Sequence, residues 1–183
     1  MQKRWLTALI LSMLALLAGC QSLAGEEMKG VPARVVNADK SISIIRATFN
    51  GQGVSGGGGD ECCISIPRKW KPGMTAEITW KKDPSPELNP GNIPPPKWKN
   101  GHSTPEWDEW MRIHRSNYQT LSKIVNVPRY DRTCGVSLIF LPCDDPRVII
   151  DCDQDLAIMN NLPGGEKFDS ELIRRLGGRQ SCR

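Results

Sequence analysis

Beyond residue 20 the sequence has no long hydrophobic run, and the mean hydropathy of the chain is −0.39. A membrane-spanning helix needs about 20 consecutive apolar residues, so this part of the chain is expected to be soluble. An excess of one charge is also missing. Lys3 and Arg4 are two of the 24 basic residues, and without them 22 remain against 20 acidic residues. A nearly neutral chain gives no basis for nucleic-acid binding.

Histidine is scarce, and the usual catalytic and metal-binding patterns are missing. The chain has two histidines, His102 and His114, and no Cys-x-x-Cys pair, which argues against a zinc site. Ser55 is the centre of a formal Gly-x-Ser-x-Gly, but more glycines follow it instead of the strand-to-helix turn of a serine hydrolase. His114 is interpreted as a semi-buried structural residue. We therefore expect no catalytic residue, no metal, no cofactor and no enzymatic activity.

Three alternating aspartates near the C-terminus form an incomplete calcium-loop pattern. Asp151, Asp153 and Asp155 have the spacing of an EF-hand loop, which needs glycine at its sixth position and glutamate at its twelfth. Leu156 and Leu162 occupy those two positions. Calcium binding is therefore not expected.

The most specific signal lies at the N-terminus. Lys3 and Arg4 precede an apolar run over residues 6–17, and the run closes on Leu-Ala-Gly-Cys at residues 17–20. The order of basic start, apolar run and small residues is that of a secretory signal. Its end resembles the bacterial lipobox, which implies that residues 1–19 are removed and that Cys20 becomes the acylated first residue.

This processing sets the expected location and domain limits. Several acyl chains hold a protein firmly on a membrane, whereas one holds it only marginally, so we expect a lipid-anchored protein of the cell envelope, on the periplasmic side. By analogy with sorting in enteric bacteria, Gln21 after the cysteine favours the outer membrane. Residues 20–30 are small and polar, as in a tether. Residues 31–183 are long enough for one domain.

Six further cysteines remain when Cys20 is set aside: Cys62, Cys63, Cys134, Cys143, Cys152 and Cys182. An even number in an oxidising compartment predicts a disulfide framework. Six cysteines allow 15 pairings, and the sequence leaves the pairing open. Adjacent residues on a strand point to opposite faces, so Cys62 and Cys63 are expected to bond to two different neighbours.

Alternating hydrophobicity predicts several short strands. Two strands are expected around a turn at residues 37–40, the second extending to Phe49. Residues 62–66 and 76–80 are interpreted as an antiparallel pair, and residues 136–141 and 148–151 as a hairpin. Cys134, Cys143 and Cys152 mark the start, tip and end of that hairpin.

The middle of the chain combines a proline-rich loop with helix signals. Six prolines between Asp83 and Asn100 exclude regular structure, and this loop carries Trp98. Pro105 with early acidic residues begins an apolar stripe at helical spacing, which predicts a helix over about 105–125. A shorter amphipathic helix is expected within 165–178. The elements predict an α+β fold with a mainly antiparallel β-sheet or sandwich-like core, stapled by disulfides.

Several motifs together resemble a known group of proteins. Four glycines at 56–59 precede Cys62-Cys63, and Pro-Arg-Lys-Trp-Lys-Pro-Gly at 67–73 precedes Trp80. The pattern resembles small bacterial lipoproteins with a domain of unknown function that are found beside type VI secretion phospholipase effectors. It covers the lipobox and roughly residues 31–83, with a late hairpin resembling 137–150.

The resemblance implies a function without catalysis. Some of these lipoproteins act as immunity proteins, which implies that this chain binds and inhibits a cognate periplasmic phospholipase. Loops on a rigid scaffold commonly carry binding, so Gly57, Gly58, Gly59, Asp60 and Trp98 are the candidate contact residues. The alternative is a cell-envelope binding or structural lipoprotein, in which tryptophans such as Trp98 stack on sugars.

Overall fold

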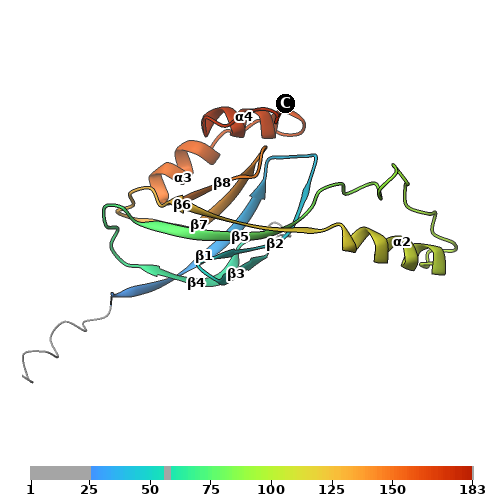
Figure 1. Cartoon of the computed structure of the whole chain (residues 1–183). Helices are drawn as coiled ribbons and strands as arrows, with labels where there is room; N and C mark the ends of the chain where they lie inside the picture. The colour runs from blue at the N-terminus through green and yellow to red at the C-terminus, as the bar shows by residue number, and fades with distance from the viewer. Residues whose placement is uncertain (1–25, 56–58, 183) are drawn as a thin grey trace, which may run out of the picture.

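The computed structural model describes residues 26–55 and 59–182, so Cys20, Gly57 and Gly58 lie outside the described residues. Within these ranges, eight strands form two four-stranded sheets and three helices accompany them (Figure 1). The first sheet has the order β4 (Glu61–Pro67), β1 (Met28–Asn37), β7 (Thr133–Leu141), β8 (Asp145–Asp151). The second has the order β3 (Gln52–Ser55), β2 (Ser43–Phe49), β5 (Thr75–Asp83), β6 (Gln119–Asn126). The predicted α+β class with a mainly β core is confirmed.

The main core lies between the two sheets. In β5, Ala76, Ile78 and Trp80 are buried and alternate with more exposed residues, because successive side chains of a strand point to opposite faces. The ring of Trp80 lies 5.5 Å from that of Phe140 on β7, across the core. The alternation that was visible in the sequence therefore defines the inner face of the second sheet.

A second core covers the outer face of the first sheet. Helix α4 (Lys167–Arg175) contributes Leu172 and Ile173, which cluster with Ile139 and Leu141 of β7. Strand β7 is consequently buried on both faces from Val136 to Leu141. This explains its nearly continuous apolar sequence.

The strand over 62–66 pairs differently from the prediction. Strand β4 pairs with β1, and β5 pairs with β2 and β6, so the expected antiparallel pair of β4 with β5 is wrong. Both strands do face the same core, but from opposite sheets. Their connection crosses the end of the sandwich, where the indole nitrogen of Trp70 donates to the carbonyl of Val127 at 2.9 Å. The hairpin of β7 and β8 is confirmed.

The long helix is shorter than predicted. Helix α2 spans Pro105–Ser116, and after Asn117 the chain turns into β6, which pairs with β5 along its whole length. Leu121 and Val125 are four residues apart, a spacing that fits one face of a helix as well as one face of a strand. In the structure both pack against the main core as strand residues. The backbone hydrogen bonds with β5 therefore decide that these residues form a strand and not a helix.

The three aspartates begin a helix that was not predicted. Asp151 is the N-cap of α3 (Cys152–Met159), and its carboxylate accepts hydrogen bonds from the backbone nitrogens of Asp153 at 3.0 Å and Gln154 at 3.2 Å. Aspartate is a favoured residue at this position because it satisfies the free N–H groups of the first turn. The predicted C-terminal helix is confirmed as α4.

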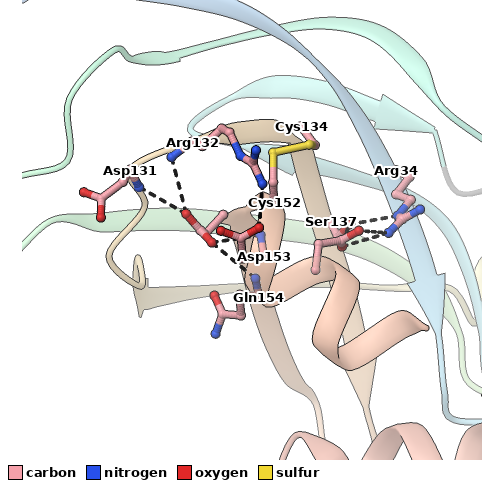
Figure 2. Close-up of a disulfide and its surroundings, with 10 residues drawn as sticks. Arg34, Asp131, Arg132, Cys134, Ser137, Cys152, Asp153 and Gln154 are labelled. Atoms are coloured by element: carbon pink, nitrogen blue, oxygen red, sulfur yellow. Dashed lines mark hydrogen bonds and ion pairs between the residues drawn. A yellow bond between two sulfur atoms is a disulfide. The ribbon is translucent and has the colours of Figure 1, made fainter. Parts of the chain in front are cut away.

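The described cysteines form three disulfides, Cys134–Cys152, Cys143–Cys182 and Cys62–Cys63. Disulfide bonding is confirmed, but the expectation that Cys62 and Cys63 bond to different neighbours is wrong. Both lie exposed on β4, at the edge of the first sheet, and the four other cysteines in the described ranges pair with each other. Figure 2 shows Cys134–Cys152, which joins the start of β7 to the start of α3.

None of the helices described is long and apolar enough to cross a membrane.

Candidate functional site

The connection from β5 to β6 forms a separate arm. We call residues 84–118 the arm; it consists of an irregular strap, residues 84–104, followed by α2. Figure 1 shows α2 and the strap projecting from one end of the sheets, while α3 and α4 lie over the opposite part of the molecule. Residues 84–118, all of which the structure describes, contribute no side chain to the hydrophobic cores on the two faces of the first sheet.

A buried polar network holds the root of the arm. The Nε2 atom of His114 lies 2.7 Å from a carboxylate oxygen of Asp83, and its Nδ1 atom lies 2.9 Å from the side-chain oxygen of Asn89. Asn89 donates its amide nitrogen to the carbonyl of Trp110 at 2.9 Å, so its oxygen must face the ring. Burial raises the pKa of Tyr118, and the negative charge of Asp83 acts in the same direction.

These contacts join three separate segments. Asp83 is the last residue of β5, Asn89 lies in the strap and His114 lies in α2, and all three are buried. Each ring nitrogen of His114 lies within hydrogen-bonding distance of one side-chain oxygen, so all three side chains have a partner. Buried polar groups that are fully hydrogen-bonded rigidify their surroundings. The arm is consequently fastened to the sandwich as a defined unit.

Local sequence explains where α2 begins. Thr104 is its N-cap and accepts a hydrogen bond from the backbone nitrogen of Trp107 at 3.3 Å, with Pro105 in the first turn. The hydrogen bond with Thr104 lowers the pKa of Glu106, and the nearby charge of Lys99 also lowers it. An acidic side chain in the first turn complements the helix dipole. The predicted start of the helix is confirmed.

Aromatic rings continue outward from the network along α2. The centroids lie 4.4 Å apart for Trp110 and His114, 5.7 Å for Trp107 and Trp110, and 5.4 Å for Trp98 and Trp107. Aromatic pairs at such separations are favourable beyond their buried area. The strap tryptophan is thereby connected, ring by ring, to the buried root.

The arm exposes several large apolar side chains among its charged and polar ones. Eight large hydrophobic side chains are exposed among the residues described, and four of them, Leu88, Ile93, Trp98 and Ile113, belong to the arm. Ile93 and Trp98 are each 55% exposed. Exposed apolar groups that cluster on one feature mark an interaction site more often than scattered ones do.

A pocket of about 300 Å³ lies at the root of the arm, lined by Asp83, Ser85, Asn89 and His114 among others. The hydroxyl of Ser85 donates to the carbonyl of Leu88 at 3.0 Å. Both ring nitrogens of His114 are already engaged by Asp83 and Asn89, so neither is free to accept a proton from Ser85. The contacts of His114 with Asp83 and Asn89 therefore hold the arm in position.

The predicted contact residues do not come together. Asp60 lines a small pocket of about 130 Å³ with Arg34, Ser137 and Asp155, whereas Trp98 lies on the arm. Gly59 precedes Asp60, and Gly57 and Gly58 fall outside the described residues. The two predicted segments therefore belong to different surfaces.

The pocket beside Asp60 is bordered by a structural ion pair. Arg34 donates to Asp155 at 2.7 and 2.8 Å and to the hydroxyl of Ser137 at 2.8 Å, and Ser137 donates to Asp155 at 2.9 Å (Figure 2). These bonds connect β1 and β7 with α3. The guanidinium and the carboxylate satisfy each other, so this cluster fastens α3 to the first sheet.

Sequence reasoning singled out His114 but missed its partners. Asp83 and Asn89 lie 31 and 25 residues away from it in the chain, and no local spacing relates them. The one available signal is a histidine on an apolar helix face, because a buried imidazole requires hydrogen-bond partners.

Comparisons with known proteins place the chain in a family. No curated protein and no solved structure matches it significantly. The family profile described as "Protein of unknown function (DUF3304)" matches residues 35–148. The matched part runs from within β1 into β8 and includes the whole arm. The chain therefore belongs to the DUF3304 family.

Proposed function

We propose that this chain is a lipid-anchored periplasmic protein that binds and inhibits a phospholipase effector of a type VI secretion system, with the arm as its contact surface. Inhibition by binding needs a stable complementary surface and no catalytic group. The resemblance of the glycine, Cys-Cys and Trp-x-Pro-Gly motifs to immunity lipoproteins supports this class of partner.

The observation that carries the proposal is the exposed apolar surface of the arm on a buried, hydrogen-bonded root. Binding costs less free energy when the contact surface is already ordered. Tryptophan is enriched among residues that dominate binding energy, and Trp98 is half exposed although Trp107 supports its ring. The arm therefore has the properties of an interface and contributes little to the main core.

The position of the arm fits a partner in the aqueous compartment. Met28, where β1 begins, comes eight positions after Cys20, and an extended segment of that length spans at most about 28 Å. A lipid on Cys20 would hold the start of β1 near the membrane. Figure 1 shows the start of β1 and α2 at opposite ends of the molecule, which directs the arm away from the anchor.

The test uses residues 21–183, which retain every described residue, with the disulfides verified by mass spectrometry. We expect nanomolar binding to a purified phospholipase effector from the same genome and loss of its lipase activity at equimolar ratio. The reduced and unfolded chain is the control. If none of the phospholipase effectors of that genome binds the oxidised protein, the proposal is wrong.

The anchor has an independent test. Cys20→Ser in the full chain removes the acylated sulfur, so we expect the variant to lose the incorporation of labelled palmitate that the wild type shows, while residues 26–182 keep their fold. A variant that still incorporates the label would refute lipidation at Cys20. Gln21→Asp in the full chain is expected to move the anchored protein from the outer to the inner membrane.

A second candidate function follows from the exposed indole of Trp98. Tryptophan faces stack on sugar rings, so the arm is also suited to a glycan of the cell envelope. Retention on purified peptidoglycan by the wild type, lost in Trp98→Ala, would favour this envelope-binding function.

A further inference from the structure

The middle of the strap is a segment that is exposed almost throughout. We call residues 92–100 the strap tip; its sequence is Asn-Ile-Pro-Pro-Pro-Lys-Trp-Lys-Asn. Eight of these nine residues are exposed, and Pro96 is half-buried. A segment with so little contact to its own fold would usually be disordered unless other bonds hold it.

Such bonds are present at both ends. The backbones of Asn89 and Ile93 exchange two hydrogen bonds of 2.9 and 3.2 Å, and those of Lys99 and His102 exchange two of 3.0 and 3.3 Å. The indole nitrogen of Trp110 donates to the carbonyl of Ile93 at 3.1 Å. Asn89 and Trp110 also belong to the root network, so the strap tip is attached directly to the buried part of the arm.

The sequence between these ends adds stiffness. Each of three consecutive prolines fixes its φ angle, and each also restricts the residue before it. Proline-rich segments favour the extended polyproline conformation, which loses little entropy on binding. Between its turn residues Asn92 and Asn100, the strap tip is therefore stiff and favours an extended course.

Its chemistry is apolar with one sign of charge. Ile93, Pro94, Pro95 and Trp98 supply apolar surface, and Lys97 and Lys99 are the charged residues of the segment. Across residues 26–55 and 59–182, neither lysine forms an ion pair within 4 Å, in contrast to Arg112, which pairs with Glu109 at 2.7 Å. Both ammonium groups are thus available to a partner.

We infer that the strap tip inserts into an apolar cleft of the partner whose rim carries carboxylates, with Trp98 and Ile93 inside the cleft and Lys97 and Lys99 paired at the rim. This inference rests on the proposed function, because a phospholipase must hold acyl chains in an apolar cleft. The extended prolines match the narrow shape of such a cleft. Inhibition then follows from occupation of the substrate's path.

The experiment measures binding of the purified effector to residues 21–183 by calorimetry and stopped flow. Trp98→Ala is expected to raise Kd at least 30-fold, as removal of a central hot-spot residue does. Lys97→Glu with Lys99→Glu is expected to lower the association rate at least tenfold at low salt, because opposite charges steer the encounter. High salt should reduce the difference in association rate between this double variant and the wild type.

Matched controls separate the strap tip from general surface effects. Ile124→Ala and Leu156→Ala remove exposed apolar groups elsewhere, where these side chains are 71% and 62% exposed, and should bind as the wild type does. Lys69→Glu with Lys167→Glu reverses two other exposed lysines and should leave the rate unchanged. Lys97→Arg with Lys99→Arg keeps both charges and should retain fast association.

The outcomes distinguish the two proposals. Wild-type binding that none of the strap-tip variants weakens would overturn the inference and leave the proposed function standing. Absence of wild-type binding, with the fold and disulfides intact, would overturn both. Retention on peptidoglycan that Trp98→Ala abolishes, without any binding to the effector, would assign the strap tip to a glycan instead.

Discussion

A glycine lies at a close contact between β1 and β7, the two parallel strands. Gly135 has a φ of +155°, and a Cβ atom added to it would lie 2.9 Å from the carbonyl oxygen of Pro32 on the neighbouring strand. Real Cβ atoms do not approach backbone atoms so closely, so one of the two strands would have to move. Gly135 thus permits a close contact at the start of β7, next to the Cys134–Cys152 disulfide.

The first prediction therefore concerns Gly135→Ala. We expect it to lower the free energy of unfolding by about 2 kcal/mol, as overpacking of a tight contact does, measured by urea denaturation of the oxidised protein. Gly164→Ala is the matched control, because a Cβ atom there meets no atom within 4 Å. Equal stability of the two variants would show that β1 and β7 have room to adjust.

At the scale of elements, the arm behaves as a structured unit although half of it has no regular secondary structure. Six prolines in the strap remove backbone donors, and the buried contacts of Asp83 and Asn89 with His114 compensate for that loss. Long loops of this kind are commonly functional. The order of the arm depends on side chains more than on backbone ladders.

The second prediction tests this dependence. His114→Ala removes the ring that contacts the buried carboxylate of Asp83 and leaves that carboxylate with the backbone nitrogen of Ser85 at 3.0 Å, which costs about 3 kcal/mol. We expect faster amide hydrogen exchange across residues 84–117, with the sheets protected as in the wild type. His102→Ala is the control, since His102 is exposed. Exchange in the arm that is equal for both variants would contradict the role of the network.

At the scale of the whole molecule, the disulfides differ in what they connect. Cys143–Cys182 joins the turn of the β7–β8 hairpin to the chain beyond α4 and closes a separation of 39 residues, and Cys134–Cys152 closes 18. Cys62–Cys63 joins adjacent residues. A bridge stabilises mainly by restricting the unfolded chain, and this effect increases with the logarithm of the length of the loop that it closes.

The third prediction compares these bridges. Cys143→Ser with Cys182→Ser should lower the free energy of unfolding by roughly 3 to 4 kcal/mol and expose α4 to proteolysis. Cys62→Ser with Cys63→Ser should change it by less than about 1 kcal/mol, because no loop is released. The measurement is chemical denaturation of each double variant. A larger loss of stability in the Cys62 and Cys63 double variant would contradict this ranking of the two bridges.

The elements that the sequence determined by itself are those with short-range causes. The alternation over 76–80, the hairpin over 136–151 and the Thr104-Pro105 start of α2 each depend on residues within a few positions of one another. Their physical basis is side-chain direction, turn chemistry and capping. The α+β class and the disulfide bonding followed from the same local patterns and from the even number of cysteines.

Tertiary structure decided everything that required distant residues to meet. Residues 119–126 became a strand because β5 offered a complete ladder, and β4 paired with β1 because the connection through Trp70 crosses between sheets. The meeting of Asp83 and Asn89 with His114 likewise had no local signal. Local secondary-structure preferences differ by a few tenths of a kcal/mol per residue, whereas strand pairing and the burial of apolar side chains involve several kcal/mol. The tertiary contacts therefore override the local preferences.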